Sequence, residues 1–317
     1  MQNLKTKGLR ALGGGFLIAG LCAGPSTAQG LFGLDLEGSL GEGGFDRYVP
    51  PVTMFVLNET PFITTELKPI YAWHKIPEGF VTDGGDVHAF ALQGRLAVTD
   101  RLAIIATTDG WADIDFNNSV LDDTDGFLDL AFGAKYAIVS DPAAGNIVTV
   151  GARYTAPIGD VDTNLGATNI DLTGAGDGYV NGFVSAAKLF DNGSQIQGSL
   201  GINWGLADEN WSYVHVHGHA DHELLPGFFP LIEANAILPI DGGDRLTGAL
   251  GGVTGADIFD PGGANPNPIF SLAIGARYRP MDNVILGIAI EGNMTDNAND
   301  ADSVYGSRLT TDVTFHF

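Results

Sequence analysis

The chain has 317 residues, of which 44% are hydrophobic and only 17% charged, and 15 basic against 38 acidic side chains leave a net charge of −23. Such an acidic chain repels nucleic acid, and no basic patch interleaved with aromatic residues is present, so nucleic-acid binding is excluded. The mean hydropathy is +0.12. After the N-terminal region, however, no apolar run approaches the roughly 18 residues that a transmembrane helix needs.

The N-terminal residues have the pattern of a secretory signal peptide. The first ten residues hold three basic residues and no acidic one, residues 11–23 are apolar, and Ala28 ends a small-residue cleavage motif. We therefore predict a signal peptide at residues 1–28. Cys22, the only cysteine, lies within it, so the mature chain should lack disulfides and thiol chemistry. A lipoprotein anchor at Cys22 is the alternative, but Leu21 before it is larger than such anchors take.

Residues 29–61 are punctuated by Gly and Pro and are predicted to form a periplasmic N-terminal extension. From there to the C-terminus, segments of about 11–15 residues alternate apolar and polar side chains, which is typical of strands with two different faces. Small or charged residues on the second face indicate a lumen rather than solvent. Twelve such strands are predicted, at residues 62–76, 86–98, 101–115, 126–140, 145–158, 178–190, 194–207, 211–223, 228–238, 268–279, 283–294 and 305–317.

The connections between these segments predict a transmembrane barrel. Alternate links are short and most others are long, which matches the short periplasmic turns and long external loops of outer-membrane barrels. We predict an all-β, closed antiparallel barrel of about twelve strands over residues 62–317, in the outer membrane of a Gram-negative cell among lipid and lipopolysaccharide. The C-terminal Phe317 matches the signal read by the barrel-insertion machinery. The longest external link, 239–267, is expected to carry an extra hairpin at 246–253.

Four segments carry a resemblance to a known family. Residues 125–136 resemble a "gfgDl-x-lg-x-Ky" pattern, residues 154–160 the "lPtGd" that follows it, and residues 92–104 and 277–286 two further turn-centred hairpins. Together they resemble the outer-membrane barrels described as the putative MetA-pathway of phenol degradation family. The resemblance covers most of the predicted barrel and implies a transport-type barrel with aromatic or other apolar substrates. It implies no catalytic residue.

Charged residues on the predicted inner face are candidates for solute selection. An unpaired charge in a narrow lumen is costly, so pairing that braces the barrel and selection of solutes are both expected. If anions pass, Arg153→Gln should lower anion preference, whereas Asp162→Asn in an external loop should change it little because exposed charges are screened. The candidates are the cations Arg95, Lys135, Arg153 and Arg277 and the counter-charges Glu66, Asp129, Glu291 and Asp312.

Residues 215–222 are rich in histidine and resemble the metal motif of metallo-β-lactamases, although the strand pattern does not fit the αββα fold of those enzymes. On a strand, His217 and His219 point the same way. If the next turn is tight, Glu233 lies opposite His219 and Asn235 opposite His217. A Zn²⁺ or Ni²⁺ site at His217, His219 and Glu233 is therefore one hypothesis. The favoured alternative is a His219–Glu233 hydrogen bond that braces the hairpin.

Two acidic stretches, at 122–126 and 160–164, superficially resemble calcium loops but do not match the EF-hand pattern. Weak divalent cation binding is the most that they indicate, and no cofactor is expected. No His-x-Ser pair like that of outer-membrane phospholipase and no Gly-x-Ser-x-Gly elbow occurs, so no enzymatic activity is predicted.

The predicted function is a channel or transporter for small solutes, with aromatic or apolar compounds suggested by the family resemblance. Twelve strands lie between the eight whose interior side chains fill and the 16–18 that leave an aqueous channel, so a narrow pore is expected, plugged by loops or by the N-terminal segment. The alternative is a non-conducting structural or surface-interaction barrel whose acidic loops meet ions or partners.

Overall fold

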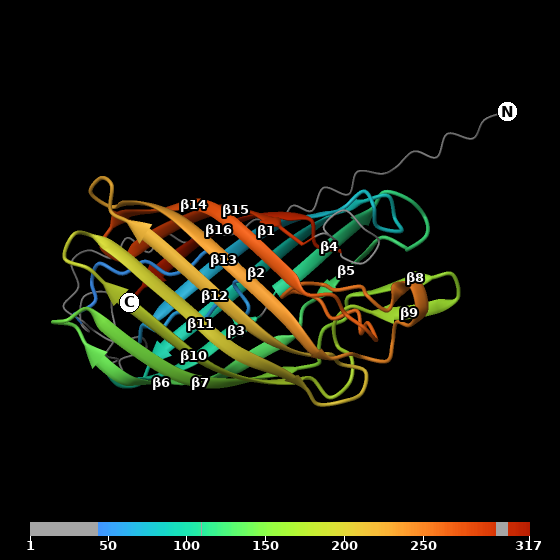
Figure 1. The fold of residues 1–317 in the computed structure, drawn as a ribbon, viewed down its shortest axis with the longest axis horizontal. Coiled ribbons are helices and arrows are strands. Elements are labelled where there is room, and N and C mark those ends of the chain that lie inside the picture. The colour runs from blue at the N-terminus through green and yellow to red at the C-terminus, as the bar shows by residue number, and fades with distance from the viewer. Residues whose placement is uncertain (1–43, 109, 296–303) are drawn as a thin grey trace. The chain divides into compact units, whose positions relative to one another are not determined.

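The computed structural model describes residues 44–108, 110–295 and 304–317, which all belong to one compact unit (Figure 1). No helix within these ranges is long and apolar enough to cross a membrane. The strands are β1 (Glu66–Ile76), β2 (Gly85–Ala97), β3 (Leu102–Thr108), β4 (Gly110–Phe116), β5 (Thr124–Phe127), β6 (Leu130–Asp141), β7 (Asn146–Ala156), β8 (Asp162–Leu165), β9 (Thr168–Asp171), β10 (Tyr179–Leu189), β11 (Ser194–Gly205), β12 (Ser212–His222), β13 (Phe228–Asp241), β14 (Ile269–Met281), β15 (Val284–Asn293) and β16 (Ser307–His316).

Antiparallel pairing of neighbours closes the sheet, because β1 pairs with both β2 and β16. Two wall strands are interrupted: β3 and β4 both pair with β2, while β6 pairs with β3 and β5 with β4. Counted as wall strands, the described chain forms a closed antiparallel barrel of twelve, which confirms the predicted fold. The hairpin of β8 and β9 forms a separate small sheet.

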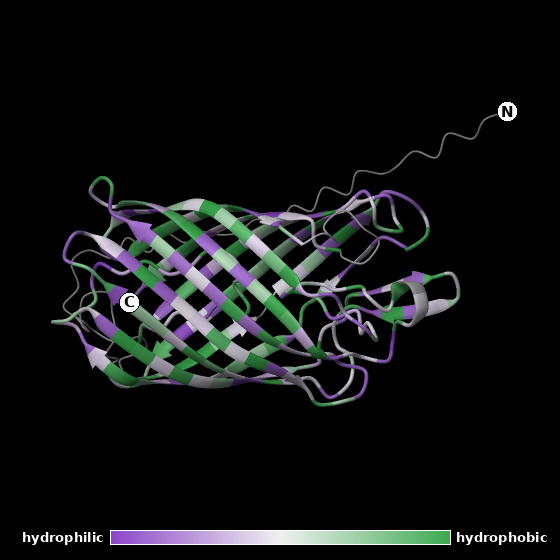
Figure 2. Cartoon of the chain, viewed as in Figure 1, coloured by the Kyte–Doolittle hydropathy of each residue, from purple (hydrophilic) through white to green (hydrophobic). Residues whose placement is uncertain are grey.

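The two faces of the wall differ as period-two alternation requires (Figure 2). On β14, Phe270, Leu272 and Ile274 are exposed on the outer face, whereas Ser271 and Ala273 are buried on the inner face. Large apolar side chains are exposed in the same way around the whole wall. Such a surface would be unstable in water and is the lipid-facing band of a membrane barrel.

The residues directly before β1 lie inside the barrel. Residues 44–65, which we call the plug, start at the end of the barrel that carries the short turns and turn back at Met54–Asn58, where the Asn58 N–H donates to the Met54 carbonyl. They then return to β1. The plug includes residues 44–61 of the segment that the sequence analysis assigned to a periplasmic extension. Residues 1–43, including the predicted signal peptide, lie outside the described part of the chain.

The extra hairpin lies in a different loop from the one expected. Residues 246–253 contain a short 3₁₀ turn, η2 (Gly248–Leu250), instead of paired strands. Leu246 and Val253 are buried in an apolar cluster, and Leu246 bridges to Gly263 of the same loop. This Gly-rich segment therefore packs against its own loop, and the observed hairpin, β8–β9, belongs to the external loop between β7 and β10.

The lipid face yields a stability prediction. Ile274 is 69% exposed on the outer face of β14, so Ile274→Arg places a charge against lipid. We expect a loss of about 2–4 kcal/mol in the free energy of unfolding if this position lies near the bilayer midplane. Urea unfolding in lipid vesicles, followed by heat-modifiable gel migration, measures it against Ile274→Val. Equal stability of the two variants would mean that the strand register is reversed.

Candidate functional site

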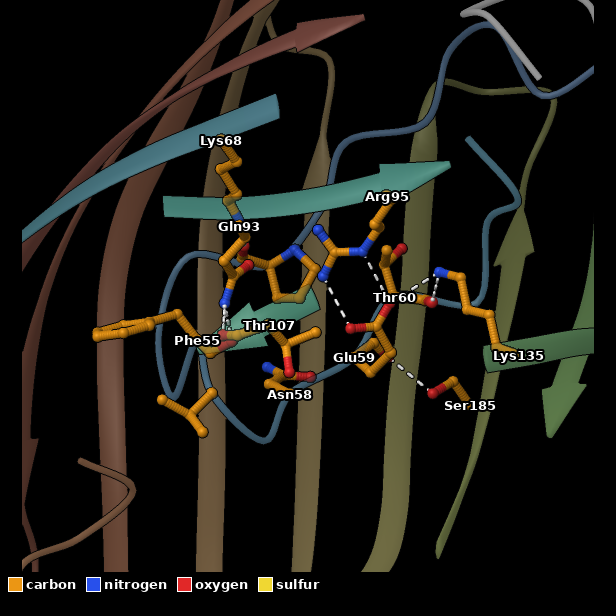
Figure 3. Close-up of polar contacts among 12 residues, drawn as sticks. Phe55, Asn58, Glu59, Thr60, Lys68, Gln93, Arg95, Thr107, Lys135 and Ser185 are labelled. Atoms are coloured by element: carbon orange, nitrogen blue, oxygen red, sulfur yellow. Dashed lines mark hydrogen bonds and ion pairs between the residues drawn. The ribbon is translucent and has the colours of Figure 1, made fainter. Parts of the chain in front are cut away.

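A buried ionic cluster fixes the plug to the wall (Figure 3). Arg95 of β2 donates through Nε and Nη2 to the two carboxylate oxygens of Glu59, each at 2.8 Å, and through Nη1 to Glu66 at 2.7 Å. Lys135 of β6 donates to Glu59 at 2.8 Å and to the Thr60 carbonyl at 2.7 Å. Two cations of the wall are thus balanced by one carboxylate of the wall and one of the plug.

The protonation state of Glu59 follows from these neighbours. Burial alone would raise the pKa of this carboxyl, but the positive charges of Arg95 and Lys135 more than offset it and hold the pKa below its usual range. Glu59 is therefore ionised under ordinary conditions. Removing its charge would leave two buried cations with one anion, which is more costly than removing an exposed pair.

The plug backbone is held by donors from the wall. Pro50 and Pro51 have no N–H and the plug is too irregular to satisfy its own carbonyls, so these groups need partners in the lumen. Inward-facing side chains from many strands supply them. The bonds run from Gln195 and Gln197 to Val49, from Arg277 to Pro50 and Pro51, from Lys68 to Pro51, from Gln93 to Phe55, from Arg153 to Leu57, from Ser185 to Glu59 and from Thr149 to Pro61.

Glu233 of β13 is a second anchor. Its oxygens accept from the Val52 and Thr53 backbone N–H groups, both at 2.8 Å, and from the Thr53 hydroxyl. His219 Nδ1 lies 2.8 Å from Glu233, and His219 Nε2 lies 2.7 Å from Asp221. The imidazole thus links two carboxylates, one of which holds the plug.

The predicted pairing of the histidine strand is confirmed, since His219 lies opposite Glu233 and His217 opposite Asn235. The contact between His219 and Glu233 is the one that the bracing alternative predicted. His217 bonds Asn235 Oδ1 at 2.9 Å and His215 Nδ1 at 3.1 Å. In the described ranges, no group of three or more His, Cys, Asp or Glu residues is arranged to hold a metal ion.

The other candidate lumen residues divide into three cases. Arg277 forms an ion pair with Asp312, and Glu291 forms one with Arg308 at 3.0 Å. Arg153 instead bonds neutral groups, among them Asn181 Oδ1 at 3.0 Å.

Asp129 is the third case, and its predicted role as a counter-charge to the lumen cations was wrong. It lies at the interruption between β5 and β6, where strand alternation fails, and its Oδ1 accepts from the backbone N–H groups of Gly159 and Gly174 at 2.9 Å. It therefore binds an external loop and is not a counter-charge to a lumen cation.

Arg308 joins the plug to the longest external loop and was not among the predicted site residues. It donates to Asp257 of that loop at 2.6 Å and lies 5.4 Å from the centre of the Phe55 ring. Asp257 also accepts from the Val56 N–H at 3.3 Å. Alternation along β16 places Arg308 on the inner face with Asp312, so the sequence did contain a signal for Arg308. The expected plug, formed by loops or by the N-terminal segment, singled out no residue, and nothing in the sequence identified Glu59 as its anchor.

Above the plug, towards the end of the barrel with long loops (the loop end), lies an apolar pocket. It has an empty volume of about 550 Å³, part of it open to solvent, and Thr163 is the one polar residue in its lining. Its walls also belong to an apolar cluster that continues along the inner faces of β1 and β2 to Phe55 of the plug. The pocket lining is Ile76, Phe80, Val81, Val87, Ile114, Phe116, Leu121, Thr163, Ile170, Leu172, Leu246, Leu250, Val253, Phe259, Pro261 and Val304.

Solved structures with a similar fold are outer-membrane barrels. An outer membrane channel from Pseudomonas putida F1 matches with a TM-score of 0.54 and 15% identity, over 85% of this chain and 100% of that chain. The NanC porin matches with a TM-score of 0.50 and 8% identity, over 79% and 100%. At these identities the likeness shows the fold alone. No family model and no curated protein matches the sequence, so membership of the MetA-pathway family stays a prediction.

The ionic cluster yields a prediction for plug release. Glu59→Gln leaves Arg95 and Lys135 without the plug carboxylate, at a cost of about 3–5 kcal/mol in the anchoring of the plug. We expect larger or more frequent conductance steps in planar bilayers than the wild type gives. Glu78→Gln, at an exposed position of the external loop after β1, is the matched control. Unchanged conductance in a folded Glu59→Gln barrel would show that this anchor does not keep the pore closed.

The lowered pKa of Glu59 predicts how the anchor responds to pH. A carboxyl whose folded pKa is depressed contributes stability above its unfolded pKa, about 4.3, and loses it as the pH falls through the folded value. Conductance should therefore stay constant from about pH 8 to about pH 5 and rise only in stronger acid. The conductance of Glu59→Gln should show no such rise in strong acid. Opening near about pH 6 would instead identify a histidine as the sensitive group.

Proposed function

We propose that this protein is an outer-membrane channel for small apolar or aromatic solutes, which it receives in the apolar pocket at the loop end. The observation that carries the proposal is the pocket itself, with its almost wholly apolar lining above a plugged lumen. Apolar compounds gain free energy by leaving water for such a surface. The outer-membrane fold and the resemblance to the MetA-pathway family are consistent with this substrate class.

The proposed setting is the outer membrane of a Gram-negative cell. The exposed apolar band would contact lipid, with lipopolysaccharide around the loop end, and the last strand, β16, would be read by the barrel-insertion machinery. Weak divalent binding by the acidic loops remains a prediction for the same region.

The lumen charges have a structural role in this proposal. Arg95, Lys135 and Arg277 are paired with carboxylates, and they hold the plug or lie against it. We infer that they act on solutes only after the plug moves. Arg153, which bonds neutral groups, would then be the residue that most favours anions.

The plug itself favours a second candidate function. A lumen filled by its own chain is also what a non-conducting structural barrel would have, with the acidic loops as its contact surface. Solute uptake separates the two. Intact cells with lipopolysaccharide exclude the apolar fluorophore N-phenyl-1-naphthylamine, so cells that express the protein should take it up faster than cells that lack it. Equal rates would favour the structural function.

The pocket makes a residue-level prediction within the same assay. Leu250 lines the pocket and is half-buried, so Leu250→Asp introduces a charge there without emptying a core. We expect uptake of the fluorophore to fall at least about fivefold, because a carboxylate and its water compete with the apolar probe. Val120→Asp, at an exposed position of a neighbouring external loop, is the control. Equal uptake by the two variants would remove the pocket from the solute path.

A further inference from the structure

The barrel wall has a seam near the loop end, where strand pairing stops. β5 and β6 are two parts of one wall strand, and β5 is the part nearer the loop end. β6 pairs with β7 from Leu130 and Ala156 onward, whereas β5, within the described residues, pairs only with β4. On the other side of β5 no wall strand is present, because β7 has already ended at Ala156 and β10 begins only at Tyr179. Residues 157–178, which include the β8–β9 hairpin, cover this side of β5 in place of a wall strand.

A few side-chain contacts hold the seam together instead of a ladder of backbone bonds. Besides two carboxylates, the Thr163 hydroxyl donates to the Asp122 carbonyl at 2.7 Å and the Thr173 hydroxyl to the Phe127 carbonyl at 3.2 Å. Asp160 accepts from the Phe127 N–H through Oδ1, and its own N–H donates to the Phe127 carbonyl at 3.0 Å. Asp129 accepts from Gly159 and Gly174, as described above. Irregular backbone at membrane depth occurs where it lines a cavity or is buried in protein. A wall closed by a few side-chain bonds opens at lower cost than one closed by a full ladder.

The seam is apolar on both sides. Outside, Phe127 is 62% and Ile158 65% exposed. Inside, Leu128 and Val161 are buried in the apolar cluster that also lines the pocket. The register places Phe127 at the end of a row of outward-facing aromatic residues like the girdle at a membrane interface, formed by Tyr71, Phe90, Trp111 and Phe127.

We propose that this seam is a lateral passage, through which an apolar solute moves between the pocket and the hydrocarbon of the outer leaflet while the plug stays in place. The proposal rests on the proposed function for the solute class. The axial route requires the Glu59 cluster and many wall-to-plug bonds to break. The lateral route requires the Asp129 and Asp160 contacts and the two threonine bonds to open. An apolar solute that follows it avoids the polar lower lumen and does not return to water.

A disulfide across the seam tests the passage. The chain has one cysteine, Cys22, in the predicted signal peptide, so F127C/D160C gives a defined pair. In N-phenyl-1-naphthylamine uptake by intact cells, we expect the oxidised protein to lose its uptake and dithiothreitol to restore it. The control is A131C/T155C, whose residues are partners in the regular β6–β7 ladder, where oxidation should change nothing. Equal uptake by oxidised and reduced F127C/D160C overturns the passage.

A second variant keeps the proposal testable if the disulfide does not form. Asp129→Ala removes two hydrogen bonds to a charged acceptor and should raise uptake at least about fivefold. Asp162→Asn, at an exposed position of β8, should leave uptake unchanged. A folded Asp129→Ala protein with wild-type uptake overturns the passage. If wild-type cells take up the probe no faster than cells without the protein, the proposed function fails instead, and the passage with it.

Discussion

An extended chain inside a narrow barrel must find hydrogen-bond partners outside itself, and this constraint shapes the inner wall. Buried backbone carbonyls are rarely left unpaired. The plug has two consecutive prolines and a positive φ at Met54, so it cannot form regular structure of its own. Arginine, lysine and glutamine side chains of the wall supply the missing donors. The polar inner face is therefore explained by what it binds within the same molecule.

The same constraint accounts for the placement of charge. The chain is acidic and has few basic residues, yet several of these basic residues lie in the lumen. Each of them contacts a carboxylate or carbonyl groups of the plug. Arg308 is the most connected, because it contacts Asp257 of an external loop, Glu291 of the wall and the ring of Phe55 in the plug. Movement of that loop would thus reach the plug both through Arg308 and through the bond between Asp257 and the Val56 N–H.

The sequence predicted the wall well because lipid and lumen impose period-two alternation over long segments. It also predicted the β12–β13 register, because a tight turn fixes which residues face each other. A plug formed by loops or by the N-terminal segment was expected from the strand number alone. Its contacts could not be predicted, since 44–65 has no periodicity and its partners are far along the chain. Asp129 was misplaced for a related reason: alternation was extended across a break between β5 and β6 that the sequence does not mark.

The inner face is divided along each strand. On β1, Glu66 and Lys68 face the plug, whereas Ile70 and Ala72 belong to the apolar cluster below the pocket. β2 runs the other way and has the same division, because its antiparallel register puts Arg95 opposite Glu66 and Ala91 opposite Ile70. A polar half that satisfies a buried backbone cannot also accept an apolar solute. The apolar half, nearer the loop end, can accept such a solute. The wall loses its continuous strand pairing at the same height along the barrel.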